Sequence, residues 1–261
     1  MIDIHSHIMP EIDDGARTVE EAVKMAEIAA GDGIEMMVST PHMFNGLSHN
    51  PFPDEIAERI KALQQAFGST LKILPGNEVH ISHEIADQAK SHRVTPINNR
   101  NYMLVEFPQL TVPLGVDDLF YKLQLQSIYP ILVHPERNAQ IQGRPSIVAG
   151  LVERGVLIQV TAMSMTGEFG PIPKQCAEIL LKHNCVHFLA TDTHRPERRP
   201  PILSKGRDAA AKIIGAEGAR KLVYDNPLAV VNGEPVEIDP PISFNGSQKG
   251  EKQSLFSRFF G

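Results

Sequence analysis

Hydrophobic residues along the chain form short unbroken runs that alternate with longer stretches of helical period. The runs have the length and composition of buried β-strands and lie at residues 1–5, 34–40, 71–74, 102–107, 130–133, 156–161 and 186–190. Strands that are apolar on both faces are typical of a parallel sheet covered by helices. The pattern therefore predicts seven parallel strands.

The stretches between these runs carry apolar residues every three or four positions. Thr18 and Glu21 form a capping box, which predicts that a helix begins at this threonine. Ile56 and Leu63 share one face of a second expected helix at 54–67. Strands that alternate with helices predict an α/β fold. Further helices are expected at about 82–91, 116–127, 145–154, 173–183, 203–214 and 217–224.

Residues that can bind metal ions or phosphate stand at the carboxyl ends of six of the seven runs. In chain order they are His5 and His7, then His42, Glu78, Glu106, His134 with Arg137, and Asp192 with His194. The sixth run offers nothing stronger than Gln159 and Thr161. A doubly wound sheet gathers its ligands at one switch point, whereas all strand ends of a closed barrel face the same mouth. The pattern therefore favours a seven-stranded barrel.

His5 and His7 are separated by one residue at the end of the first run. Side chains two apart on a strand point the same way, so the two imidazoles make half of a divalent metal site. Asp13 or Asp14, on a turn closed by Gly15, could add a carboxylate oxygen. Taken alone, the segment also fits a strand with a solvated end. Most of the other six histidines are expected to be surface or packing residues; the six are His49, His80, His83, His92, His183 and His187.

Five histidines and at least four carboxylates are too many ligands for one ion. Two or three ions bridged by carboxylates would use them, and a shell without thiolate suits Mn²⁺, Fe or Zn²⁺. Such a cluster supplies hydroxide at neutral pH and neutralises phosphoryl oxygens. Arg137 and Arg199 could hold phosphate oxygens in bidentate fashion. The basic loop 195–199 could also be merely solvated, or Arg195 or Arg198 could take the role of Arg199.

Length and composition allow one large domain. The chain has 261 residues, of which 42% are hydrophobic and 21% charged, and an α/β barrel commonly has this length. A net charge of −6 and a pI near 6.0 argue against broad nucleic-acid binding. No run approaches the roughly 18 apolar residues of a membrane helix, and the N-terminus lacks a signal-peptide pattern. We therefore expect a cytoplasmic protein without membrane insertion.

The two cysteines do not fit a thiol-based phosphatase. Such enzymes place an arginine six residues after the nucleophilic cysteine. Lys182 stands six residues after Cys176, and Thr191 six after Cys185. A cysteine nucleophile is therefore not expected, and two cysteines do not make a disulfide framework.

Taken together, these motifs resemble the PHP (polymerase and histidinol phosphatase) superfamily. The order and spacing are most similar to the bacterial metal-dependent tyrosine-protein phosphatases of capsule and exopolysaccharide loci, over about residues 1–232. The motifs are His5-Ser-His7, Asp13-Asp14-Gly15, Ser39-Thr-Pro-His42, Gly76-Asn-Glu78, Leu104-Val-Glu-Phe107, His134-Pro-Glu-Arg137 and Asp192-Thr-His194.

This resemblance implies a distorted (β/α)7 barrel with a site for three divalent ions, usually manganese, at the carboxyl ends of the strands. It implies cleavage of phosphotyrosines in the tail of a partner tyrosine autokinase that controls polysaccharide export. Arg137 and Arg199 would bind phosphate, and Arg199 rather than Arg198 falls at the family's spacing. The implied metal ligands are His5, His7, Asp14, His42, Glu78, Glu106, His134, Asp192 and His194.

The resemblance also divides the chain and leaves alternatives. Residues 1–239 are expected to form the phosphatase domain, and 240–261 a linker-like tail with a short amphipathic end. Within the superfamily, a phosphatase acting on histidinol phosphate or a phosphodiesterase is also conceivable, although a nuclease should show a basic channel. A degenerate barrel with a regulatory role is a non-enzymatic alternative, but the complete ligand set argues against it.

Overall fold

The computed structural model describes residues 1–46 and 49–244, and its strands are all paired in parallel. Each of the seven expected runs contains a strand, so this prediction is confirmed. The strands are β1 (Ile2–Ser6), β2 (Met36–Ser39), β3 (His42–Met43), β4 (Lys72–Pro75), β5 (Glu78–His80), β6 (Tyr102–Glu106), β7 (Tyr129–Val133), β8 (Leu157–Thr161) and β9 (Phe188–Ala190).

The second and third strand positions of the barrel are each split in two, which the sequence did not predict. β1, β2 and β4 form one sheet, whereas β3 and β5 join β6, β7, β8 and β9 in a second. One break contains Pro41, which lacks the N–H that a strand ladder needs. The other contains Gly76, where a Cβ would lie 2.8 Å from Val38 Cγ1. After these breaks, β3 begins with His42 and β5 with Glu78.

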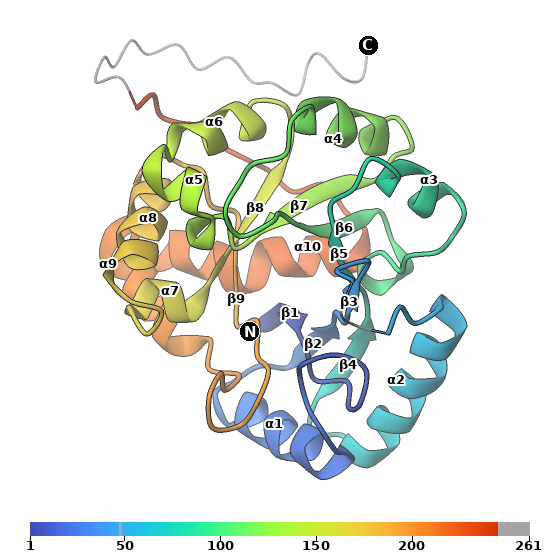
Figure 1. Ribbon diagram of the computed structural model, residues 1–261. Coiled ribbons are helices and arrows are strands. Elements are labelled where there is room, and N and C mark those ends of the chain that lie inside the picture. Colours follow the sequence, from blue (N-terminus) through green and yellow to red (C-terminus); the bar gives the residue numbers. More distant parts are fainter. Residues whose placement is uncertain (47–48, 245–261) are drawn as a thin grey trace.

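The ring closes between the first and last strands. Ser6 forms an isolated parallel bridge with Thr193, and the backbone N–H of His7 donates to the carbonyl of Thr193 at 2.9 Å. The backbone N–H of Asp192 donates to the carbonyl of His5 at 3.0 Å. These contacts set the first strand beside the segment that follows β9. The result is a distorted barrel with its carboxyl ends on one face (Figure 1).

Ten α-helices lie in the described part of the chain, and most surround the strands (Figure 1). The Thr18 hydroxyl accepts from the backbone N–H of Glu21, so the predicted N-cap is confirmed. The two expected helices at 203–214 and 217–224 run together across Gly215, whose φ is 80°. The helices are α1 (Val19–Gly31), α2 (Pro53–Phe67), α3 (Ile85–Lys90), α4 (Val116–Gln124), α5 (Ala139–Gly143), α6 (Ser146–Val152), α7 (Ala162–Thr166), α8 (Pro171–Lys182), α9 (Ser204–Arg220) and α10 (Asn226–Asn232).

Buried apolar residues of the strands divide between two clusters, as the alternation of side chains on a strand requires. The outer cluster packs the strands against the surrounding helices. The inner cluster fills the barrel and includes Val230 and Val231 of α10, which closes its amino-terminal end. The Tyr102 hydroxyl donates to the carbonyl of Glu234 at 2.7 Å, and Asn98 Nδ2 donates to that of Val231 at 2.8 Å. The barrel is therefore sealed at one end.

The segment after α10 keeps contact with the barrel as far as it is described. The backbone N–H of Ile242 donates to the carbonyl of His183 at 2.9 Å. The rings of His183 and Phe244 stack with centroids 3.9 Å apart. The division at residue 240 stays a prediction, and the expected amphipathic end at 255–260 lies outside the described residues. None of the helices in the ranges given above has the length and hydropathy needed to span a bilayer.

Candidate metal centre and phosphate site

A register shift in β1 turns His5 toward the inside of the barrel. Ile4 belongs to the inner cluster, so a regular strand would point the next side chain outward. The pairing of β1 with β2 shifts between Asp3 and Ser6, which adds one residue to β1. Such bulges commonly re-aim a side chain beside an active site. His5 and His7 consequently face the same point, with Nε2 atoms 3.3 Å apart.

Four ligand atoms converge at this point. Glu78 Oε2 lies 3.4 Å from His5 Nε2 and 3.3 Å from His7 Nε2. Asp192 Oδ1 lies 3.5 Å and 3.4 Å from the same two nitrogens. A tetrahedral ion with ligands at about 2.1 Å has ligand atoms about 3.4 Å apart. The ligand atoms of His5, His7 and Glu78, which lie 3.3–3.4 Å apart, therefore have the spacing of three ligands of a divalent ion.

The other ring nitrogens of both histidines are held by neighbours. His5 Nδ1 donates to Gln159 Oε1 at 2.9 Å, and His7 Nδ1 donates to Asp13 Oδ2 at 2.7 Å. In the neutral tautomers that carry the proton on Nδ1, both Nε2 atoms keep a lone pair that could ligate an ion. Metal-ligating histidines characteristically donate their second N–H in this way. Gln159 and Asp13 are therefore positioning residues.

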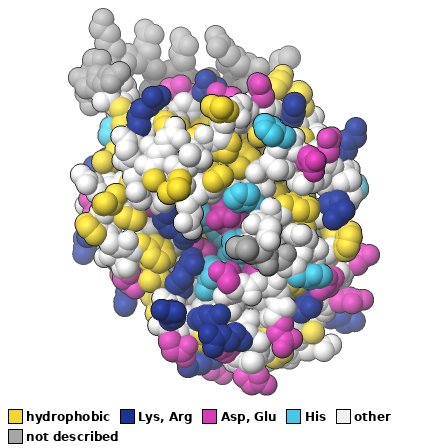
Figure 2. Space-filling view, viewed as in Figure 1, with side chains coloured by type: hydrophobic (Ala, Val, Ile, Leu, Met, Phe, Trp, Pro, Cys, Tyr) yellow, Lys and Arg dark blue, Asp and Glu magenta, His cyan; other side chains and the backbone are white. Residues whose placement is uncertain are grey.

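All nine side chains expected as ligands come together at the mouth of the barrel. Asp14 Oδ1 lies 3.5 Å from His42 Nε2 and 3.3 Å from His194 Nε2, in a group that His7 completes. Several residues belong to two groups, which is the arrangement that adjacent ions require. The four groups are His7, Asp14, His42 and His194; His5, His134 and Asp192; His5, His7 and Glu78; and His42, Glu78 and Glu106. Figure 2 shows histidine and acidic side chains gathered in a hollow of this face.

Two of these residues have left-handed backbones just after their strands. His134 follows β7 with φ 37° and ψ 47°, and Asp192 follows β9 with φ 51°. Non-glycine residues rarely adopt this conformation, and such strain concentrates at functional sites. The turn at His134 leads directly into the 3-10 turn that carries Arg137.

Asp192 joins the candidate metal centre to the two arginines. Its Oδ2 atom accepts from Arg137 Nη1 at 2.5 Å and from Arg199 Nη2. Burial alone would raise the pKa of Asp192, but His5, Arg199 and Arg137 hold it well below its usual range. Arg198, by contrast, is exposed. The structure therefore brings Arg137 and Arg199, but not Arg198, to the same carboxylate.

Burial and neighbouring positive charges shift the pKa values of the buried carboxyl groups in opposite directions. Burial would raise the pKa of the Glu78 carboxyl, but His5 and His42 hold it well below its usual range. Neither cysteine shares this environment, because burial raises the pKa of both thiols to about 12. Cys176 and Cys185 are therefore protonated thiols, as expected for packing residues.

Sequence reasoning missed the roles of three residues of the site. Gln159 is a weak candidate ligand in the sequence because it is an amide, and its role in the structure is to orient His5. Asp13 was an alternative to Asp14 and instead holds His7. The Phe169 ring centroid lies 5.4 Å from Arg137 Cζ and 5.5 Å from Arg199 Cζ. No motif in the sequence marks this phenylalanine.

The other six histidines lie outside the four ligand groups. His80 Nδ1 is 3.4 Å from Glu106 Oε2, at the edge of the site. His187 is buried, and its Nδ1 accepts from the backbone N–H of Ile158 at 2.9 Å. His49 pairs with Glu55 at 3.0 Å on the surface. His83 and His92 are exposed, and His183 packs on the terminal segment as described above.

Comparisons with known proteins place this geometry in a family. The family model described as "Capsular polysaccharide synthesis, CpsB/CapC" matches residues 1–232. Tyrosine-protein phosphatase YwqE of Bacillus subtilis is 37% identical over 99% of this chain and 100% of its own length.

Comparison with solved structures leads to the same family. A chain from the crystal structures of YwqE and of CpsB from Streptococcus pneumoniae, both metal-dependent tyrosine phosphatases, matches with TM-score 0.89 and 33% identity, covering 93% of this chain and 98% of that one. Histidinol phosphate phosphatase of Lactococcus lactis matches with TM-score 0.56 and 17% identity over 81% of this chain and 93% of that one, which is a likeness of fold alone. The chain therefore belongs to the CpsB/CapC family of capsular polysaccharide synthesis proteins.

Proposed function

We propose that this chain is a metal-dependent protein-tyrosine phosphatase that acts without a cysteine nucleophile. The observation that carries the proposal is the convergence of nine candidate ligands and two arginines on one hollow of the barrel. The activity named for the two phosphatases described above supports the reaction class.

Three divalent ions would use the ligands present. Glu78 supports more than one ion, because Oε2 faces His5 and His7 while Oε1 lies 2.8 Å from His134 Nε2. One carboxylate would thus bridge two ions. The shell suits Mn²⁺, Fe and Zn²⁺ alike, and the family resemblance makes manganese our choice. The ions would be shared among the four ligand groups described above, and their ligands would be His5, His7, Asp14, His42, Glu78, Glu106, His134, Asp192 and His194.

The chemistry divides between the ions and the chain. Divalent ions in such a shell lower the pKa of bound water and neutralise phosphoryl oxygens. Arg137 and Arg199 would hold the phosphoryl group, since each guanidinium contacts Asp192 with part of its donor set and keeps other N–H groups for oxygens. Their preorganised charge would favour the transition state, in which negative charge accumulates.

The proposed substrate is phosphotyrosine in the tail of a bacterial tyrosine autokinase that controls capsule or exopolysaccharide synthesis. The name of the family supports this setting. We place the reaction in the cytoplasm, where unpaired thiols such as Cys176 and Cys185 stay reduced.

Turnover by chelator-stripped protein, with Mn²⁺ added back, tests the proposal. We expect cleavage of a phosphotyrosine peptide only after metal is added. His7→Ala should abolish it, and His83→Ala, which changes an exposed histidine, should not. Metal-dependent cleavage of histidinol phosphate alone would refute the protein substrate, and near-normal turnover by His7→Ala would refute the ligand assignment.

A further inference from the structure

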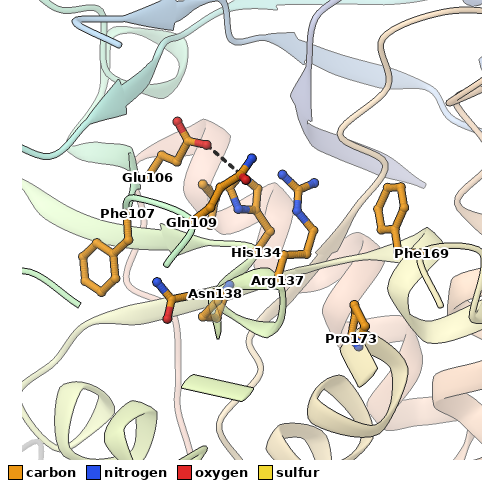
Figure 3. A pocket seen from close by; sticks show the side chains of 10 residues that line it. Glu106, Phe107, Gln109, His134, Arg137, Asn138, Phe169 and Pro173 are labelled. Atoms are coloured by element: carbon orange, nitrogen blue, oxygen red, sulfur yellow. Dashed lines mark ion pairs between the residues drawn. The ribbon is translucent and has the colours of Figure 1, made fainter. Parts of the chain in front are cut away.

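A pocket of about 240 Å³ opens beside the candidate metal centre (Figure 3). Its polar lining consists of Glu106, Gln109, His134, Arg137 and Asn138, and its apolar lining includes Phe107, Phe169 and Pro173. A ligand with an anionic end and an apolar body would match both kinds of lining.

Phe169 is held in this pocket in an unusual way. It lies between Gly167 and Gly170, whose φ angles are 88° and 96°, on the loop that joins α7 to α8. Its ring is half-buried and belongs to neither core cluster of the described chain. The guanidinium groups of Arg137 and Arg199 both lie within 5.5 Å of its centroid. Cation–π contacts to the phosphate-binding arginines, and not core packing, therefore position the ring.

The size of the pocket fits an aromatic ring. A cavity of about 150 Å³ already holds benzene, and this one is larger. Phe107 gives a fixed wall, because its ring stacks on Phe120 with centroids 5.9 Å apart and planes at 16°. Figure 3 shows the Arg137 guanidinium between His134 and Phe169. An anionic group bound to this guanidinium would lie close to the phenylalanine ring, whose centroid is 5.4 Å from Arg137 Cζ.

We propose that this pocket receives the aromatic ring of an aryl phosphate and that Phe169 determines the preference for aryl over alkyl phosphates. The inference rests on the proposed function, because it takes the phosphoryl group to lie between Arg137, Arg199 and the metal centre. Aromatic rings attract one another in offset or edge-to-face contact, and burial of the substrate ring removes apolar surface from water.

Binding of two phosphonates, which are not hydrolysed, tests the subsite apart from catalysis. The Mn²⁺-loaded full chain is titrated calorimetrically with phenylphosphonate and with methylphosphonate. We expect wild-type protein to prefer phenylphosphonate by about tenfold, as one good aromatic contact allows. In Phe169→Ala the preference should fall to about twofold or less, and Phe169→Leu should be intermediate because it keeps apolar volume without a ring.

Ile172→Ala is the matched control, since this exposed apolar residue lies on the first turn of α8 outside the pocket lining. It should keep the wild-type preference. If Phe169→Ala and Phe169→Leu weaken methylphosphonate as much as phenylphosphonate, Phe169 only supports the arginines and the inference is wrong. If both variants bind the two phosphonates with wild-type affinities, the pocket does not use Phe169 and the inference is also wrong. Failure of the wild type to cleave a phosphotyrosine peptide would instead count against the proposed function.

Discussion

At the scale of single residues, the Asp192 carboxylate connects two kinds of chemistry. One oxygen lies within 3.5 Å of His5 and His7, and the other accepts from Arg137 and Arg199. A phosphoryl group held by the arginines would therefore lie beside the candidate metal centre. The two arginines are therefore held at the candidate metal centre by a buried carboxylate, and are not merely solvated charges on the surface.

Arg199 and its neighbour Arg198 allow a matched comparison. Arg199→Ala should lower kcat/KM for a phosphotyrosine peptide by about 1–3 kcal/mol of transition-state stabilisation, because it removes donors aimed at the reacting group. Arg198→Ala removes the same charge from an exposed side chain and should have little effect. Steady-state kinetics of both variants decides the point. Equal losses would mean that net charge of the loop, and not the position of Arg199, matters.

Gln159 gives a second prediction at this scale. Gln159→Leu keeps the bulk of the side chain but removes the acceptor that fixes the His5 ring, so the affinity for Mn²⁺ should fall by about 10- to 100-fold. Calorimetric titration of chelator-stripped protein measures this. Gln65→Leu, on the exposed face of α2, is the control. Unchanged affinity in Gln159→Leu would show that His5 is oriented by its backbone alone.

At the scale of elements, the sequence predicted the seven strands and the ligands at their ends. Unbroken apolar runs indicate strands that are buried on both faces. Ligands at the ends of most strands indicate a closed barrel, in which all strand ends surround one opening. The register shift in β1 was not predictable, because the pattern Ile-Asp-Ile-His5 fits a regular strand equally well. The split strands were missed because β3 and β5 are too short to show a period. Phe169 was missed because its role depends on arginines distant in the chain.

The turn that carries Asp13 and Asp14 requires the backbone of Gly15 to lie very close to the backbone of His7. A Cβ at this position would overlap the backbone oxygen of His7, which accepts from the N–H of Ala16 at 3.1 Å. Gly15→Ala should therefore displace the His7 backbone or the turn and lower kcat/KM by about 100-fold, the effect of a misplacement near 1 Å.

Gly31 gives the control for this prediction. A Cβ there meets nothing within 4 Å, and Gly31→Ala should leave activity unchanged. Kinetics at saturating Mn²⁺, with circular dichroism to verify folding, compares the two variants. Wild-type activity in Gly15→Ala would mean that the turn adapts without moving its ligands.

At the scale of the whole molecule, the barrel separates a charged mouth from a sealed, apolar end. The ligands and arginines lie at the carboxyl ends of the strands, whereas α10 and the inner cluster close the other end. His187 precedes β9 near the closed end, and its carbonyl accepts from Asn226 Nδ2 of α10 at 2.8 Å. His187 is a buried histidine that lies away from the candidate metal centre, and burial alone shifts its pKa.

Burial lowers the pKa of His187 to about 3, against 6.5 for the free side chain. Above pH 6.5 the ring is neutral in folded and unfolded chains, so His187 adds no pH dependence there. Between pH 6.5 and about 3 the unfolded chain binds a proton that the folded chain excludes. The free energy of unfolding should therefore fall with decreasing pH, by up to about 1.4 kcal/mol per pH unit from this residue.

Urea unfolding at pH 7.5 and 5.5, in the presence of chelator, measures this contribution. His187→Asn keeps an acceptor for the backbone N–H of Ile158 but has no group that titrates in this range. The variant should be less stable at pH 7.5, because it leaves a cavity, yet should lose less stability on going to pH 5.5. His92→Asn, which changes an exposed histidine, should follow the wild type at both values. Parallel losses in the wild type and His187→Asn would show that the buried ring gains a proton without unfolding of the chain.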